Sequence, residues 1–400
     1  MLEFFKNYIK GDRTIWIILI ILAFASLLAV YSSSGVLAYK YYGGNAARYL
    51  LRQLTMLFAG LVIILFFHRI PYKYFSKLSQ YLYYFSVLLL GITLLWGMSL
   101  NEASRWIALP GGISFQTSDL AKIALLMYLA RMLSIKEQEI KTFKGTMRYL
   151  ILPILIICGL IFPANISTSI LLFLVSMLLL FIGQVKFKYL TYAMGIAILI
   201  VTFFVLIAYI SPYKGRVETA VSRIEAYFNP ESESNFQSQQ AKIAIASGGL
   251  IGKGPGNSVQ RNVLPHPYSD FIYAIFVEEY GYIGGISLAV LFAVLFYRFI
   301  LIVKKVNRKF GAYLVMGLGM LMVFQAFAHM AVCVRILPTT GQTLPFVSMG
   351  GTSIIFLSAA MGVILSVSRE VNEIEAKKKQ EMNFDENENN LSEPINNENE

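Results

Sequence analysis

Long apolar runs alternate with short polar connections along most of this chain, a pattern typical of polytopic membrane proteins. A helix needs about 20 apolar residues to cross a bilayer core. Ten runs come close to this length or exceed it, at residues 15–34, 49–67, 78–97, 115–133, 149–163, 166–183, 189–210, 271–303, 312–336 and 346–367. We therefore expect an all-α polytopic membrane fold of about ten transmembrane helices, forming one domain over residues 1–370.

The eighth run, residues 271–303, is longer than one span requires, and it is interrupted by Gly281, Gly284 and Gly285. We expect this run to enter as an interfacial helix and then to cross the membrane. The fifth run, residues 149–163, is short for a span.

Lysine and arginine concentrate in every second connection, at residues 6–13, 69–77, 131–148, 186–188 and 304–309. Cytoplasmic loops of membrane proteins carry the excess of positive charge. This bias predicts two cytoplasmic termini and an extracytoplasmic position for the long polar segment, residues 211–268. The first apolar run has no small-residue cleavage pattern after it and is interpreted as an anchor. The acidic, Asn-rich stretch at residues 371–400 is expected to be a disordered cytoplasmic tail.

The composition agrees with a membrane protein, since 56% of the residues are hydrophobic and 14% are charged, with a mean hydropathy of +0.61. Orientation in the membrane explains the net charge of +11 better than nucleic-acid binding does. Cys158 and Cys333 lie in apolar runs and suggest neither a disulfide framework nor a zinc site.

Asp270 is a carboxylate at the point where the long polar segment ends and an apolar helix begins. An ionisable group in this position loses hydration, so it persists mainly where it is paired or has a chemical role. The pair Ser269-Asp270 before an apolar run is also an ordinary helix N-cap signal. The residues alone leave both interpretations open, a catalytic group and an N-cap.

A glycine-rich stretch lies within the long polar segment, at residues 247–258. It is not a Walker loop, because Gly254 follows Lys253 where that loop needs Ser or Thr. Its exposed amides and Lys253 could approach an anionic lipid headgroup, with Gly252 and Gly254 supplying the turn. The alternative interpretation is a mobile surface loop.

Four runs in a fixed order resemble the SEDS family, which comprises the division polymerase FtsW, the elongation polymerase RodA and their sporulation relative SpoVE. They are residues 105–122, 248–257, 265–285 and 337–353. With the ten-span layout, the resemblance covers residues 16–369. The runs Gly256-Asn-Ser-Val-Gln260 and Leu337-Pro-Thr-Thr-Gly341 are more similar to FtsW than to RodA.

The resemblance implies an inverting peptidoglycan glycosyltransferase that polymerises lipid II at the outer face of the bacterial cytoplasmic membrane, for septal wall synthesis in cell division. Asp270 matches the family's catalytic aspartate, and a single base-activated displacement needs only one carboxylate. The chain departs from the family pattern at Asp119, a shortened acid, and at Asn165, an amide to which no role is carried over. The alternatives are a lipid II flippase, a RodA-like elongation polymerase and a non-catalytic division scaffold.

Three cations near the outer ends of spans two, three and four are candidate ligands of the pyrophosphate: Arg52, Arg105 and Lys122. Snorkelling to the interface would also explain the two arginines. Lys122 could instead pair with Asp119, three residues before it on the same helix.

The remaining candidate substrate ligands are Lys253, Glu279 and Ser348. Supporting structural roles are expected for Asp119, Glu278, Gly252 and Gly254. A divalent cation, Mg²⁺ or Mn²⁺, could bridge the pyrophosphate to Asp270 or Glu279, although no ligand cluster requires it. The resemblance also implies a class B penicillin-binding protein transpeptidase as a partner, besides lipid II, membrane lipids and other division proteins, and no nucleic acid.

Overall fold

The computed structural model describes residues 10–35, 39, 43, 45, 47–96, 98–100, 103–109, 113–210 and 236–392, without the side chains of 96–114, 204, 205, 207–210 and 384–392. In the described part, a helix lies in each of the ten predicted apolar runs: α2 (Arg13–Ser33), α4 (Ala47–Arg69), α5 (Lys73–Trp96), α6 (Thr117–Ile135), α8 (Leu152–Ile161), α9 (Ile166–Ile182), α10 (Phe187–Ile210), α13 (Ile272–Lys305), α14 (Lys309–Cys333) and α15 (Thr352–Ser392). In the described part, seven helices are long and apolar enough to cross a membrane. The helical multi-pass fold is confirmed, whereas the number of spans, about ten, is not.

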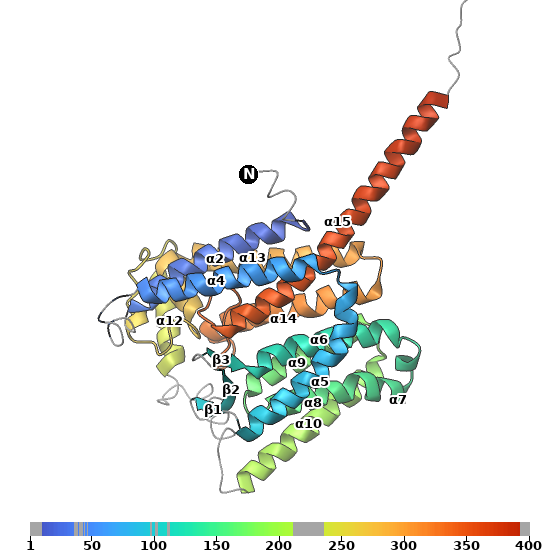
Figure 1. The fold of residues 1–400 in the computed structure, drawn as a ribbon. Coiled ribbons are helices and arrows are strands. Elements are labelled where there is room, and N and C mark those ends of the chain that lie inside the picture. Colours follow the sequence, from blue (N-terminus) through green and yellow to red (C-terminus); the bar gives the residue numbers. More distant parts are fainter. Residues whose placement is uncertain are drawn as a thin grey trace, which may run out of the picture.

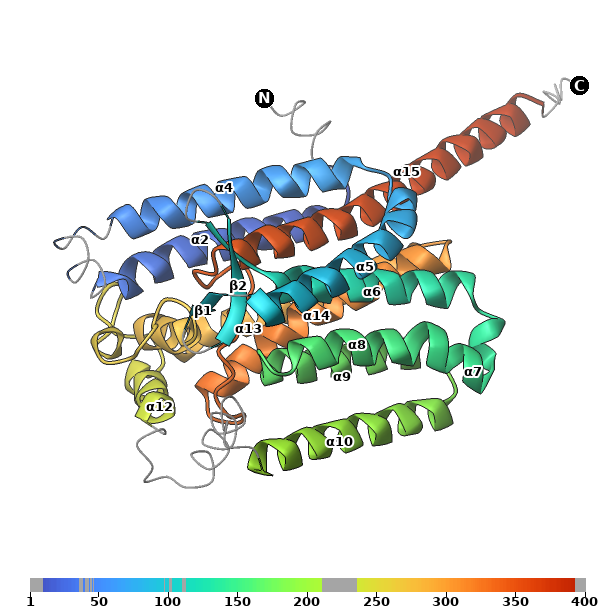
Figure 2. The ribbon, with the colours of Figure 1, turned by 60° about the horizontal axis from the view of Figure 1, so that its bottom comes forward.

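The helices pack side by side around α6 and α14, which are buried along nearly their whole lengths. α14 packs against α6, α9, α13 and α15, while α4 packs against α15 and α5 against α6. In both views α10 lies at the edge of the bundle, on the side away from α2 and α4 (Figures 1 and 2). Large apolar side chains such as Ile20, Phe24 and Phe58 point outward, as expected of a surface that lipid solvates.

A small antiparallel sheet lies between α5 and α6, at the end of the bundle opposite to the projecting part of α15 (Figures 1 and 2). Its strands are β1 (Met98–Leu100), β2 (Ala103–Leu109) and β3 (Ile113–Gln116), and β2 pairs with both neighbours. The sheet was not predicted, because residues from 115 onward were assigned to the fourth span. α6 begins only at Thr117, directly after β3.

The interruption predicted in the eighth run is a backbone kink in α13. Gly281 has φ 71° and ψ −174°, which is not helical, and divides α13 into a short first part and a long second part. The left-handed φ is one that glycine adopts without strain. Part of the predicted long polar segment is also helical, as α12 (Phe236–Gly248) and a 3₁₀ turn at Gln260–Asn262. Residues 211–235 lie outside the described part.

The predicted disorder of residues 371–400 is wrong for the part that the structure describes. Residues 371–392 continue α15 beyond the bundle as a single projecting helix (Figure 1). Ion pairs extend along its first turns, from Lys10 to Glu373 at 3.4 Å and from Lys305 to Glu375 at 3.0 Å. The polar composition of residues 371–400 predicted disorder. The helix of residues 371–392 is instead a continuation of the packed part of α15, and extending an existing helix needs no new nucleation.

Candidate functional site

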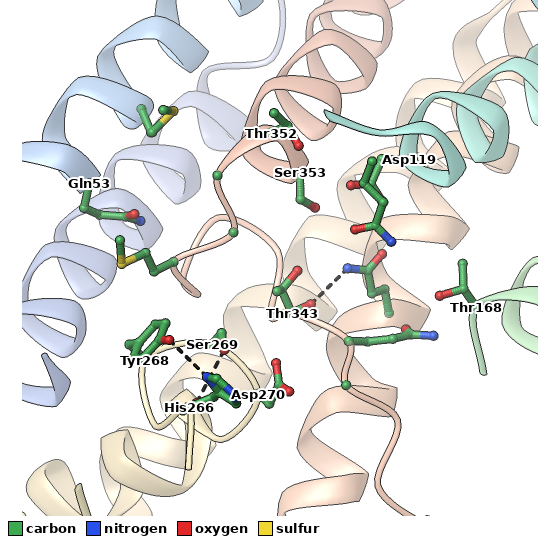
Figure 3. A pocket seen from close by; sticks show the side chains of 18 of the residues that line it. Gln53, Asp119, Thr168, His266, Tyr268, Ser269, Asp270, Thr343, Thr352 and Ser353 are labelled. Atoms are coloured by element: carbon green, nitrogen blue, oxygen red, sulfur yellow. Dashed lines mark hydrogen bonds between the residues drawn. The ribbon is translucent and has the colours of Figure 1, made fainter. Parts of the chain in front are cut away.

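A polar cavity of about 660 Å³ lies within the largely apolar bundle. Side chains from α4, α6, α9 and α14 line it, together with the segments that precede α13 and α15 (Figure 3). Its charged lining residues are Arg52, Asp119, Lys122 and Asp270. Residues distant in sequence, and separately proposed as site residues, therefore meet in one cavity.

Asp270 is half-buried at the bottom of this cavity as Figure 3 draws it. The turn that carries it begins at His266, whose carbonyl accepts hydrogen bonds from the amides of Ser269 at 3.1 Å and Asp270 at 3.2 Å. Gly341 lies opposite, and a Cβ at that position would be 3.7 Å from Oδ2 of Asp270. The N-cap of α13 is Phe271. The alternative interpretation of Asp270 as the N-cap is therefore wrong.

The segment before α15 holds the Asp270 turn in position. Ser348 Oγ donates to the carbonyl of Ser269 at 2.7 Å, and the amide of Met349 donates to the carbonyl of Tyr268 at 3.0 Å. Ser348 is buried and is not among the lining residues of the cavity. Its hydroxyl touches the turn that carries Asp270, so the structure gives it a positioning contact; its predicted contact with substrate stays a prediction.

The three predicted pyrophosphate ligands, Arg52, Arg105 and Lys122, differ in burial and in their partners. Lys122 Nζ forms an ion pair with Oδ1 of Asp119 at 2.8 Å, and both side chains are nearly buried while lining the cavity. Arg52 is exposed and lines the cavity from α4. Arg105 is in β2, and its side chain lies outside the described part. Two positive charges thus border the same cavity as Asp270.

Glu278 is fully buried, and its carboxylate accepts hydrogen bonds from the glycine-rich stretch and from the residues just after it. It accepts from Nζ of Lys253 at 2.6 Å, from the amides of Val259 and Gln260 at 3.2 Å each, and from Ser258 Oγ. Lys253 is not among the lining residues of the cavity. Lys253 instead forms an ion pair with Glu278, away from the cavity that Asp270 lines.

Glu279 likewise lies away from the cavity. It is buried on the first part of α13 and accepts a hydrogen bond from Ser32 Oγ, at the end of α2. Arg261 donates to the same hydroxyl at 3.1 Å. Asp270 lines the cavity and Glu279 does not, and the divalent cation expected to bridge the pyrophosphate to one or the other stays a prediction. No group of three or more His, Cys, Asp or Glu side chains in the described part is placed to hold a metal ion.

The glycine-rich stretch packs directly against the kink of α13. The amides of Lys253 and Gly254 donate to the carbonyls of Glu278 and Glu279, each at 3.0 Å. A Cβ on Gly252 would lie 2.2 Å from the carbonyl oxygen of Glu279. The expectation of exposed amides that face a lipid headgroup is therefore wrong for Lys253 and Gly254. These amides are used inside the protein.

Sequence reasoning missed several polar residues of the cavity. Gln53 on α4 and Gln325 on α14 line it, as does Gln342 in the segment after α14. For Gln53 and Gln325 the available signal was an amide side chain inside an apolar run, which is unusual in a membrane helix. Asn165, to which no role was given, also lines the cavity and caps α9, with Oδ1 accepting from the amide of Thr168 at 3.2 Å.

Comparison with known proteins gives matches over nearly the whole chain. The family model FtsW/RodA/SpoVE, described as cell cycle protein, matches residues 12–373. A Coxiella burnetii protein named probable peptidoglycan glycosyltransferase FtsW is 33% identical over 377 residues, covering 91% of this chain and 98% of that protein. A protein of the same name from Geobacter sulfurreducens is 31% identical over 370 residues, covering 91% of this chain and 96% of that protein.

Solved structures share the fold. The rod shape determining protein RodA of Thermus thermophilus matches with a TM-score of 0.65 and 22% identity, covering 91% of this chain and 98% of that one. A chain from a peptidoglycan synthase complex matches with a TM-score of 0.67 and 23% identity, covering 88% of this chain and 97% of that one.

Proposed function

Because the chain belongs to the FtsW/RodA/SpoVE family of cell cycle proteins, we propose that it is a peptidoglycan glycosyltransferase that polymerises lipid II. The observation that carries this proposal is the polar cavity, in which one half-buried carboxylate, Asp270, is accompanied by Arg52 and Lys122. A carboxylate and cations are the two kinds of group that glycosyl transfer from a lipid pyrophosphate requires.

Asp270 is the proposed general base. It takes the proton from the 4-hydroxyl of the acceptor sugar as that oxygen attacks the anomeric carbon of the donor sugar. The bond from the anomeric carbon to the pyrophosphate breaks in the same displacement, so the configuration inverts and the lipid pyrophosphate leaves. One carboxylate suffices, which fits Glu278 and Glu279 being bonded elsewhere.

Arg52 and Lys122 are the proposed ligands of the pyrophosphate. Negative charge grows on the departing phosphate oxygens in the transition state, and cations held nearby stabilise it most strongly in a site that excludes water. Asp119 holds the Lys122 ammonium in the wall of the cavity through the 2.8 Å ion pair. Arg105 stays a candidate for the same role.

The proposed setting is the outer face of the bacterial cytoplasmic membrane at the division septum, with both termini in the cytoplasm. The curated relatives carry the name of the division protein FtsW. One structural relative was solved within a peptidoglycan synthase complex that coordinates polymerization and crosslinking. A class B penicillin-binding protein is accordingly the proposed partner of this chain, and the 236–268 segment is the proposed contact.

Replacing Asp270 by asparagine tests the proposal. Asn keeps the size of the side chain but cannot take a proton, so glycan synthesis should fall about 100-fold or more, the range for a lost general base. Purified protein would be incubated with lipid II and the cognate transpeptidase, and the glycan strands would be separated on a gel. Detergent solution has no second compartment, so strand formation there also separates a polymerase from a flippase.

Glu137→Gln is the matched control, because Glu137 is exposed and paired with Lys309 far from the cavity. It should polymerise like the unmodified protein. Glycan synthesis by Asp270→Asn at the level of this control would remove Asp270 as the base.

A further inference from the structure

Five buried oxygens in the wall of the cavity have no hydrogen-bond partner within the described part of the protein. They are Oε1 of Gln53, Gln325 and Gln342, Oδ2 of Asp119 and Oγ1 of Thr352. The four amide- or carboxylate-bearing residues are only 1% (Gln53), 3% (Gln325), 8% (Gln342) and 5% (Asp119) exposed. These oxygens therefore have almost no contact with bulk solvent.

The other polar atom of three of these side chains is bound, which fixes the direction of the free oxygen. Gln53 Nε2 donates to Ser26 Oγ at 2.7 Å, and Gln325 Nε2 donates to the carbonyl of Thr343 at 2.9 Å. Asp119 has its Oδ1 on Lys122. Each side chain is thus held by one polar atom and left with one free acceptor.

Such an arrangement is unfavourable in the empty protein, because a buried polar atom without a partner is destabilising and most native structures contain few. A cluster of five in one cavity is explained when a ligand supplies the missing hydrogen bonds. The four amide and carboxylate oxygens are acceptors only, whereas the hydroxyl of Thr352 can also donate. The ligand group that meets the four acceptors must therefore present O–H or N–H donors.

This requirement assigns the pyrophosphate and the sugars of the substrate to different residues of the cavity. A pyrophosphate offers only acceptor oxygens, so it cannot satisfy these acceptors and belongs with the cations Arg52 and Lys122. A carbohydrate offers hydroxyl groups, and an acetamido substituent adds an N–H. Gln53 and Asp119 lie on opposite sides of the cavity with Asp270 between and below them (Figure 3). Acceptors on both sides of the base can hold two sugars that meet there.

We propose that Gln53, Asp119, Gln325 and Gln342 form a carbohydrate-binding subsite that flanks Asp270 and recognises the hydroxyl and amide N–H groups of the two lipid-linked sugars. The subsite rests on the proposed function for the identity of the substrate. It assigns the sugars in part to Gln53, Gln325 and Gln342, to which the sequence gave no role.

Gln342→Met gives the sharpest test. His329 Nδ1 contacts the main-chain carbonyl of Gln342 at 2.8 Å, and this contact survives the substitution. Met has nearly the same shape without the free oxygen, so the empty protein should unfold at the same temperature or higher. A residue kept for structure alone would lower the unfolding temperature instead.

Binding would be measured with two probes in the full-length Asp270→Asn protein, so that lipid is not consumed. One probe is lipid II, and the other is undecaprenyl pyrophosphate, which has no sugar. Gln342→Met and Gln325→Met should each raise the Kd for lipid II about tenfold, the effect of one lost hydrogen bond to a buried group. Neither should change the Kd for the sugar-free lipid, whereas Arg52→Met should weaken both.

Unchanged lipid II binding by both glutamine variants would overturn the subsite, and so would an equal loss for the two probes. These results leave the proposed function standing if the unmodified protein still makes glycan strands. An unmodified protein that makes no strands would instead contradict the proposed function.

Discussion

At the scale of single residues, Glu278 illustrates how a buried charge can organise a segment without taking part in chemistry. Its carboxylate accepts from Lys253, from Ser258 and from two main-chain amides. Buried carboxylates persist when several donors compensate the lost hydration. The segment from 253 to 260 therefore depends on one side chain of α13 for its shape.

Glu278→Gln should loosen this segment, because an amide can accept at only one of its two ends. Donors would be left without partners, and the expected destabilisation is about 1–3 kcal/mol. Thermal unfolding would measure the loss, and amide hydrogen exchange over residues 247–261 would locate it.

The same substitution at Glu137 is the control for Glu278, since the Glu137–Lys309 pair is 2.6 Å long but half-exposed on both sides. Exposed pairs contribute about 0–1 kcal/mol. Equal effects at the two positions would contradict the organising role of Glu278.

Residue-scale prediction from sequence found the carboxylate of the cavity but not its amides. Asp270 stands out because a charge beside an apolar helix is rare and because it falls in a family motif. Gln53 and Gln325 carry no charge, and an amide in an apolar run is equally compatible with a helix-packing hydrogen bond. Only the cavity distinguishes the two possibilities.

At the scale of elements, the kink of α13 and the glycine-rich stretch form one unit. The backbones approach so closely that Gly252 faces the carbonyl of Glu279, and a Cβ on Gly281 would lie 2.2 Å from the carbonyl oxygen of Leu250. Side chains at these positions would separate the two segments. The sequence pattern suggested a flexible turn, because glycine is equally typical of mobility and of close packing.

Gly252→Ala and Gly254→Ala separate these two uses of glycine. Both glycines have nearly the same positive φ, 92° and 90°, but only Gly252 faces main-chain atoms at under 3 Å. Gly254→Ala should cost about 1–2 kcal/mol from its backbone conformation. Gly252→Ala should cost about 1–3 kcal/mol more through overpacking.

Thermal unfolding of the two alanine variants would test this difference, with glycan synthesis as a second readout. Indistinguishable unfolding temperatures would mean that the stretch can move away from α13 freely. The close packing would then be irrelevant to stability.

Element-scale prediction succeeded where one physical requirement dominates. The apolar runs had to become helices, since a backbone in lipid must satisfy its own hydrogen bonds. It failed at β1–β3, where the strands are short, and at residues 371–392, where the helix continues from a packed segment despite a polar sequence. Both failures occur where neighbouring structure overrides local composition.

At the scale of the whole molecule, the distribution of positive charge predicts the orientation in the membrane. Asn262 is an exposed residue of the segment expected outside, and Met382 is an exposed residue of the projecting part of α15. Asn262→Cys should react with a membrane-impermeant maleimide in intact cells. Met382→Cys should react only after the cells are permeabilised.

The native cysteines provide the control for this experiment. Cys158 and Cys333 are buried, so the unmodified protein should remain unlabelled under both conditions. Labelling of Met382→Cys in intact cells would reverse the orientation, and with it the proposed side of the membrane for the cavity.

By itself, the sequence determined the fold class, the ten helical runs and the family, because these depend on apolar length and on motifs that are continuous along the chain. It also singled out Asp270, a carboxylate that lines the cavity. Only the tertiary structure decided which polar residues share the cavity with that carboxylate, because α4, α6, α14 and the segment before α15 meet there from distant parts of the chain. The tertiary structure likewise decided that Lys253 and Glu278 form an ion pair, since packing sets the partners of a side chain and distance along the sequence does not.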